Sequence, residues 1–364
     1  MRKWIAVMVS LCVLLCAASA AQATGVTLRT FTPFADVDFA AQGYMDMITS
    51  WEQETGNVVE DYSGAMDEMW MDNLRSMLAD GAVDVVVLPV GSGLSVQELV
   101  TVGELASSSD CGAKKFSSMK EADGSLLLAP VRLYWEALYV NTDVLARYGL
   151  GVPSTFEDLL AACAVLAQSG VQPIANALCE WNEIVLDCAA LAGAPAEQYG
   201  EQASLDGAKD VLETLVRVGA FGSDPWNMTD ADAESKFLSG EAAMRFDADG
   251  LAQLVDETRW DNVVVIRMPA KDGQSRTEVV GTPAFGVAIT RACWQDSARS
   301  EAAVSFIIRL LNEQSVVTPV GGALGSSIAA LTANASDMTG VLYDHNPDGF
   351  DSWAEGLIAQ LMGL

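Results

Sequence analysis

Residues 84–88, with the sequence Asp-Val-Val-Val-Leu, decide the fold class of this chain. Three consecutive valines before a leucine form a nearly continuous β-branched run, which is typical of a strand buried on both faces of a parallel sheet. Upstream of it, apolar residues recur at three- and four-residue steps across 66–78, which predicts a helix. The stretch Val-Val-Glu-Asp-Tyr at 58–62 predicts the strand before that helix.

The same alternation extends back to residue 26. Apolar positions from Tyr44 to Trp51 have helical spacing and stop at Gly56, and residues 26–31 alternate as a half-buried strand does. The order is therefore strand, helix, strand, helix, strand, which predicts an α/β architecture with right-handed crossovers. Trp51 and Trp70 lie on the helical stripes and are predicted to pack in the core.

The second half of the chain carries similar signals. Residues 129–141 read as extended chain, and Ser154-Thr-Phe-Glu157 predicts a capping box that opens a helix ending at Gly170. Cys163 lies on the apolar face of that helix and is predicted to be a core residue. Helical patterns also cover 205–218, 229–238 and 301–312, and extended patterns cover 242–246, 263–268 and 279–290. Since no repeat or long linker interrupts the chain, two connected α/β lobes are expected.

Composition narrows the classes of function. The 364 residues include 49 acidic and 20 basic side chains, a formal net charge of −29, and 51% are hydrophobic. So large an acidic excess argues against binding of nucleic acid and against docking on an anionic lipid surface. The one histidine, His345, leaves no histidine cluster for a metal, and no Ser-His-Asp triad unless His345 is its base.

No nucleotide-binding, metalloprotease or hydrolase motif is present, so neither a cofactor nor a metal site is expected. The alternating acidic residues Asp230, Asp232 and Glu234 lack the spacing of an EF-hand loop. They predict a solvated helix start rather than a calcium site.

The first 23 residues have the pattern of a cleaved secretory signal. A basic pair precedes an apolar run at 5–16, which is too short to span a bilayer, and small-residue cleavage sites end at Ala20 and Ala23. A lipid anchor on Cys12 or Cys16 is the alternative, but a leucine precedes each cysteine where a small residue is needed. The mature chain, with a net charge of about −31, is expected in a periplasm, at the cell surface or outside the cell.

The mature chain holds an odd number of cysteines: Cys111, Cys163, Cys179, Cys188 and Cys293. It contains no CxxC pair, so a zinc site is not expected, and at least one thiol is free or pairs with another chain. A disulfide between Cys179 and Cys188, the closest pair in sequence, stays open.

Three motifs occur in a set order along the chain. The first begins with Pro-Val-Arg-Leu-Tyr-Trp-Glu-Ala-Leu-Tyr-Val-Asn-Thr-Asp at 130–143 and continues through Tyr-Gly-Leu at 148–150 to Pro-Ser-Thr-Phe-Glu at 153–157. The second is Phe-Leu-Ser-Gly-Glu-Ala-Ala-Met at 237–244, and the third is Phe-Gly-Val-Ala-Ile-Thr at 285–290, before a helix. In this order and spacing they resemble the family 1 extracellular solute-binding proteins of bacterial ABC importers, whose best-known members bind sugars.

The resemblance implies a two-lobed periplasmic-binding-protein-like fold (type II), in which each lobe is a sheet flanked by helices and hinge strands join the lobes. By analogy, the N-terminal lobe holds 24–131 and 282–317, and the C-terminal lobe holds 132–281 and 318–364. The implied function is capture of a small solute, a carbohydrate above all, by hinge closure around an interlobe cleft. The implied partner is a membrane ABC permease, and a monomer without enzymatic activity is expected.

Sugar-binding clefts combine aromatic rings that stack on the sugar with carboxylates that accept hydrogen bonds from hydroxyls. Such side chains are expected at the carboxyl ends of strands, at the two crossings between lobes and in loops that also carry polar residues. At the crossings, glycine also lets backbone amides approach a ligand closely. The candidate ligand-binding residues are Phe34, Asp36, Tyr134, Trp135, Trp181, Trp226, Asp247, Asp249, Gly281, Thr282 and Trp353.

Structural alternatives to ligand contact stay open for these residues. Tyr134 and Trp135 alternate on one strand, so one of them is expected to face a core. Asp36 could cap a helix and the two aspartates after residue 246 could form turns. The tryptophans in loops could instead pack within a lobe.

The same sequence features are compatible with two other functions. A secreted glycoside hydrolase would use two carboxylates, and release of reducing sugar would identify it. A sensory protein of the same fold would report a bound solute to a membrane receptor. For the ligand itself, a polyamine is a further alternative, because a cation could bind between carboxylates and aromatic rings.

Overall fold

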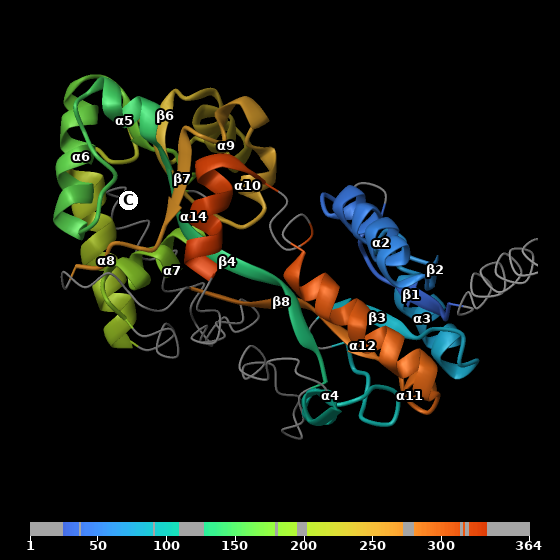
Figure 1. The fold of residues 1–364 in the computed structure, drawn as a ribbon. Coiled ribbons are helices and arrows are strands. Elements are labelled where there is room, and N and C mark those ends of the chain that lie inside the picture. The colour runs from blue at the N-terminus through green and yellow to red at the C-terminus, as the bar shows by residue number, and fades with distance from the viewer. Residues whose placement is uncertain are drawn as a thin grey trace, which may run out of the picture.

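The computed structural model describes residues 25–35, 38–89, 92–108, 127–178, 181–194, 202–271, 280–313, 316 and 320–332. Two lobes of sheet and helix are joined by two long strands (Figure 1). The predicted α/β class and the two-lobed architecture are confirmed. The predicted signal sequence lies outside the described residues.

The N-terminal lobe is built on the predicted β-α-β-α-β unit. Its elements are β1 (Thr27–Phe31), α2 (Ala41–Thr55), β2 (Val58–Asp61), α3 (Trp70–Ala79) and β3 (Val85–Pro89). Strand β1 is parallel to both β2 and β3. Helix α2 ends at Gly56, whose φ of 73° is a left-handed conformation that glycine adopts without a steric cost.

Helix α3 begins later than the pattern at 66–78 predicts. The Asp67 carboxylate accepts a hydrogen bond from the backbone N–H of Met69, and the Asp67 carbonyl accepts one from Trp70. These bonds form a turn in place of the first helical turn. The exposed Met66 and Met69 therefore lie in the loop that follows β2.

One sheet runs through both lobes. Its order among the described strands is β2-β1-β3-β8-β4-β6-β5, with β7 also paired to β4. Strands β4 (Ala129–Asn141) and β8 (Val280–Ile289) are antiparallel neighbours that cross between the lobes (Figure 1). Strand β8 is also antiparallel to β3, so β3 has a parallel neighbour on one side only. The valines of β3 are buried on both faces, as predicted, because alternate side chains pack toward α2 and toward α3.

Within the described residues, the C-terminal lobe adds three strands, of which β6 and β7 are antiparallel to β4 and β5 is parallel to β6. They are β5 (Gln172–Ile174), β6 (Ala242–Ala248) and β7 (Val263–Ile266). Helices of this lobe include α5 (Thr142–Arg147), α6 (Phe156–Gln168), α7 (Trp181–Leu191), α8 (Gln202–Arg217), α9 (Asp230–Ser239), α10 (Leu251–Leu254) and α14 (Gly322–Thr332). The N-terminal lobe has α4 (Val102–Ser108), α11 (Arg291–Trp294) and α12 (Ser297–Asn312) in addition.

Two helices of the C-terminal lobe begin with capping boxes. Thr155 caps α6: its hydroxyl accepts a hydrogen bond from the N–H of Asp158, and the Asp158 carboxylate accepts one from the N–H of Thr155. The box predicted at Ser154 and Glu157 was one residue too early, because Asp158 rather than Glu157 binds both the hydroxyl of Ser154 and the backbone of Thr155. Thr229 caps α9 in the same way, which confirms the predicted helix start.

The core of the N-terminal lobe contains both tryptophans that the helical pattern assigned to it. Trp51 stands edge-on to Phe306 of α12 with ring centroids 5.3 Å apart, and its indole N–H donates to Ser305. Trp70 packs at a tilt against Phe31, with centroids 4.8 Å apart. Both indoles are buried, as predicted.

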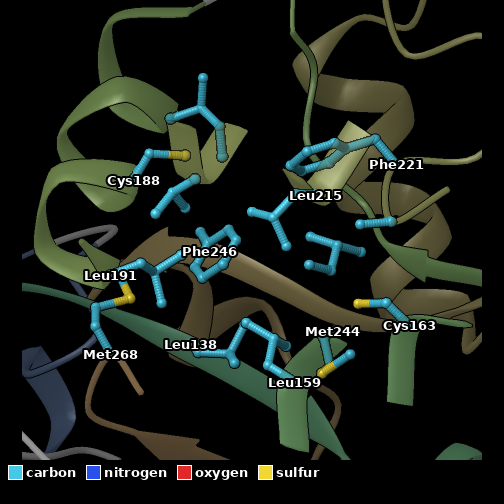
Figure 2. Close-up of a cluster of buried hydrophobic side chains, with 14 of the residues drawn as sticks. Leu138, Leu159, Cys163, Cys188, Leu191, Leu215, Phe221, Met244, Phe246 and Met268 are labelled. Carbon is cyan, nitrogen blue, oxygen red and sulfur yellow. The ribbon is translucent and has the colours of Figure 1, made fainter. Parts of the chain in front are cut away.

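The core of the C-terminal lobe includes sulfur-bearing side chains. Figure 2 shows Cys163, Cys188, Met244 and Met268 in the cluster that holds Phe246. Cys163 is buried, as predicted, and burial raises the pKa of its thiol to about 12. Cys188 is a free, fully buried thiol rather than half of a disulfide. Its suggested partner, residue 179, lies outside the described residues.

Candidate ligand-binding site

The strands of the N-terminal lobe end toward the other lobe. Along the β3–β8 pair, Val85 lies opposite Ile289 and Pro89 lies opposite Phe285. Because β8 enters this lobe at Phe285 and runs on to Ile289, the carboxyl end of β3 is the end nearer the C-terminal lobe. Strands β1 and β2 are parallel to β3, so their carboxyl ends point the same way.

The strands of the C-terminal lobe end toward the N-terminal lobe. Strand β4 enters this lobe at Glu136, which pairs with Ala248 at the end of β6, and continues to Val140, which pairs with Met244. The carboxyl ends of β5, β6 and β7 therefore point back across the hinge. Loops from three strands of each lobe thus face one another, and ligands of open α/β sheets bind at strand carboxyl ends.

The N-terminal wall of this interlobe face combines hydroxyls with exposed apolar side chains. The hydroxyls of Thr32 and Ser63 share a hydrogen bond of 2.7 Å, and Ser63 also donates to Asp61 at 2.6 Å. The loops after β1 and β2 expose Phe39 (51%) and Tyr62 (47%), together with Met66 and Met69. This wall offers rings and thioethers for an apolar ligand face beside polar groups for hydroxyls.

The C-terminal wall is rich in carboxylates. The buried Arg245 of β6 donates to Asp247, to Asp230 at 2.6 Å and to the carbonyl of Ala175 at 3.1 Å. Burial raises the pKa of Asp247, although the positive charge of Arg245 opposes that effect. Burial also raises the pKa of Asp249 to about 6. Carboxylates held in this way can accept hydrogen bonds from ligand hydroxyls.

Strand β4 forms the floor between the two walls. The phenol of Tyr134 donates to Glu136 Oε1 at 3.1 Å, on the face of the strand opposite to Trp135. Trp135 stacks on Tyr139 with ring centroids 5.8 Å apart, and the phenol of Tyr139 donates to the carbonyl of Ala248 at 2.7 Å. The stacked pair therefore fixes the end of β6 against the hinge strand.

The structure gives the predicted site residues different surroundings. Phe34 and Trp135 are buried in lobe cores, with 1% and 4% of their surface exposed. Tyr134, Asp247 and Asp249 are half-buried at the interlobe face. Ligand contact by these five residues stays a prediction.

The other predicted site residues belong to β8, belong to the C-terminal lobe or lie outside the described residues. Gly281 and Thr282 belong to β8 and pair with Trp135 and Tyr134 of β4. Trp181 begins α7, and Trp226 is half-buried against the core of the C-terminal lobe. Asp36 and Trp353 lie outside the described residues.

Three charged residues of this face were missed at the level of sequence. Arg132 and Glu136 lie within the otherwise apolar stretch 129–141, and Arg245 lies within 242–246. A charged side chain in an apolar strand is rarely buried unless it is paired, and this was the signal that could have found them. Glu136 and Arg245 are each only 3% exposed.

The described residues contain no group of three or more His, Cys, Asp or Glu side chains arranged to hold a metal ion. Asp230 and Asp232 lie in the first turn of α9, where Asp232 completes the capping box and Asp230 binds Arg245. The predicted role of this acidic run as a helix start is therefore confirmed.

Comparison with known proteins identifies the family. The family model for the bacterial extracellular solute-binding proteins matches residues 46–347. The chain belongs to this family. The chain matches none of the curated proteins with which it was compared.

Solved structures of other solute-binding proteins share the fold. RafE of Streptococcus pneumoniae superposes with a TM-score of 0.65 at 16% identity, over 94% of this chain and 96% of that one. A family 1 extracellular solute-binding protein from Bifidobacterium longum subsp. infantis gives 0.58 at 16% identity, over 93% and 94%. Maltose-bound MalE3 of T. maritima gives 0.56 at 14% identity, over 93% and 95%.

This solute-binding protein has the expected two-lobed architecture, and family membership places its function outside the cytoplasm. In the described part of the chain, no helix has the length and apolar character needed to cross a bilayer.

Proposed function

We propose that this protein captures a small carbohydrate between its lobes and delivers it to a membrane ABC importer, without chemically altering it. The supporting observation is the convergence of six strand ends, three from each lobe, on one face crossed by β4 and β8. A hinge of two strands permits closure around a ligand, and closure is stabilised by contacts that both lobes make only when closed.

The chemistry of the two walls suits a sugar. The exposed rings of Phe39 and Tyr62 offer stacking surfaces for the apolar face of a pyranose. Across from them, Asp247 and Asp249 offer carboxylate oxygens to adjacent hydroxyls, and Tyr134 lies on the floor between. We assign ligand contact to Tyr62, Tyr134 and the two aspartates, with Phe34 and Trp135 supporting them from the lobe cores.

The predicted lobe boundaries remain part of this proposal. They place the crossings between 131 and 132 on β4 and between 281 and 282 on β8. Delivery would require an exported protein at a periplasmic or outer cell surface, which is consistent with the signal pattern at 1–23.

Binding of sugars tests the proposal directly. The related structures suggest the panel, since they include a maltose complex, a receptor for β-D-galactopyranose, a chitin-oligosaccharide-binding protein and a protein of xylan utilization. We expect one carbohydrate class to raise the unfolding temperature and to titrate as one site by calorimetry. Stabilisation by a polyamine or an amino acid, with none by any sugar, would overturn the carbohydrate assignment.

Matched variants separate ligand contact from general stability. Asp249→Asn and Tyr62→Ala should each weaken sugar binding about tenfold or more, because each removes a direct ligand partner. The controls are Asp256→Asn and Tyr148→Ala, which change an exposed aspartate and an exposed tyrosine of the C-terminal lobe away from the strand ends. Release of reducing sugar from an oligosaccharide would instead identify a glycoside hydrolase.

A further inference from the structure

Several hydroxyl groups converge on Asp61, the last residue of β2, at the interlobe face. Its carboxylate oxygen Oδ1 accepts hydrogen bonds from the hydroxyls of Thr30 at 2.7 Å and Ser63 at 2.6 Å. The phenol oxygen of the fully buried Tyr44 lies 3.5 Å from the same carboxylate oxygen. Strand β1, the loop after β2 and helix α2 therefore all direct hydroxyls at one atom.

The direction of each hydrogen bond in this network follows from the number of protons available. A serine or threonine hydroxyl has one proton to donate, and an ionised carboxylate has none. Because Ser63 donates its proton to Asp61, the 2.7 Å bond between the Ser63 and Thr32 hydroxyls must be donated by Thr32. The backbone N–H of Thr32 donates to Ser63 at 3.0 Å, and that of Phe34 donates to the Thr32 hydroxyl at 3.1 Å. All donors of the network thus point toward Asp61.

The second carboxylate oxygen of Asp61, Oδ2, is available to a ligand. Within the described part of the chain, the hydrogen bonds to this carboxylate all end on Oδ1. The side chain of Asp61 is exposed, whereas Thr30 and Thr32 are fully buried. The buried hydroxyls therefore hold the carboxylate in one orientation, and hydrogen bonds aligned in one direction strengthen one another.

This network presents acceptors to a ligand, because the protons of Thr30, Thr32 and Ser63 are all used within it. A ligand atom that meets Asp61 must therefore be a donor, such as a hydroxyl or an ammonium group. We propose that Asp61 is a specificity-determining residue, which selects solutes that donate a hydrogen bond at this point and rejects groups that only accept, such as a carboxylate or a phosphate. The selectivity rests on the proposed solute-binding function, whereas the bond directions do not.

Replacement of Asp61 by asparagine should reverse the polarity of this point. The hydroxyls of Thr30 and Ser63 would continue to hold the amide oxygen in the place of Oδ1. The amide nitrogen would then take the outward place of Oδ2, where it donates instead of accepting. Asp61→Asn therefore changes the chemistry offered to a ligand while it keeps the shape of the side chain.

The same lobe contains a matched control. Glu98 accepts hydrogen bonds from the hydroxyl and the backbone N–H of Ser95, at 3.0 and 2.9 Å. Its carbonyl accepts a hydrogen bond from the N–H of Arg291, which follows β8 at the end far from the hinge. Glu98→Gln should therefore alter a hydroxyl-bound carboxylate without affecting the interlobe face.

The first experiment needs no ligand. Neutron diffraction from crystals of the perdeuterated protein locates the hydroxyl deuterons directly. We expect the deuteron of Thr32 to point at Ser63, and those of Ser63 and Thr30 to point at Asp61. A Ser63 deuteron directed at Thr32, or a deuteron bound to Asp61, would overturn the bond directions and the selectivity inferred from them.

The second experiment compares the sugar of the panel that binds with analogues in which one hydroxyl at a time is replaced by fluorine, which cannot donate. At one position, the fluoro analogue should bind about tenfold or more weakly than the sugar to the wild type and to Glu98→Gln. In Asp61→Asn that ratio should fall to about threefold or less. Equal ratios in Asp61→Asn and the wild type at every position would overturn the role of Asp61, although a sugar binds. The expected bond directions in a protein that binds no sugar would instead overturn the proposed function.

Discussion

Replacement of Asp249 by asparagine should stabilise the folded protein while weakening its function. Burial raises the pKa of Asp249 from 3.8 to about 6 in the folded protein. Between these two pH values the folded chain keeps a proton that the unfolded chain has released. The free energy of unfolding therefore falls as pH rises through this window, and the loss is complete above pH 6.

The size of the effect follows from the two pKa values. At about 1.36 kcal/mol per pH unit, the interval from 3.8 to about 6 corresponds to about 3 kcal/mol. We expect about 1–2 kcal/mol, because the half-buried carboxylate keeps part of its contact with water. Asparagine has nearly the same shape and no charge to desolvate, so Asp249→Asn should recover this energy at neutral pH.

Urea denaturation followed by circular dichroism at pH 4 and pH 7.5 measures the effect. We expect Asp249→Asn to be more stable than the wild type at pH 7.5 and to approach it at pH 4. The control is Asp256→Asn, since hydrogen bonds from Thr258 lower the pKa of the exposed Asp256, and its pH dependence should have the opposite sign. Parallel stability curves for Asp249→Asn and the wild type across this range would refute the reasoning.

Three further predictions concern the lobe cores and a helix cap. Cys163 and Cys188 should resist iodoacetamide in the folded protein and react on unfolding, as peptide mass spectrometry would show, because burial raises the pKa of both thiols. Trp51→Ala should cost about 3–5 kcal/mol in urea denaturation, since it empties a buried site beside Phe306; a loss below about 1 kcal/mol would contradict that packing. Thr155→Ala should cost about 1 kcal/mol in the same assay by removing the cap of α6, whereas Thr214→Ala on the exposed face of α8 should cost less.

Strands and helix ends were predictable where a few consecutive residues determine them. The valines before Leu88 predicted a strand buried on both faces, and Gly56 predicted the end of α2, because burial pattern and backbone conformation act over a few residues. The capping box at α6 was misplaced by one residue for a related reason. Glu157 and Asp158 both fit the pattern, and only the geometry of the first turn selects between them.

Pairing across long stretches of sequence was not predictable. Asp84 is fully buried between Arg29 and Arg299, which lie 55 and 215 residues away from it. Arg132 lies 94 residues from Asp38. No period or spacing encodes such partners, because only the folded chain brings them together.

The sequence by itself determined the α/β class, the order of most helices and strands, and the family resemblance, since these depend on hydrophobic periodicity, turn residues and motif order. The tertiary structure decided that β8 runs antiparallel between β3 and β4, which joins the lobes through one sheet. It also decided which candidate residues line the interlobe face. Phe34 and Trp135 are covered, while Asp249 stays half-exposed yet desolvated enough to raise its pKa. The physical reason is that burial and electrostatic environment are set by neighbours in space, and a sequence specifies directly only neighbours along the chain.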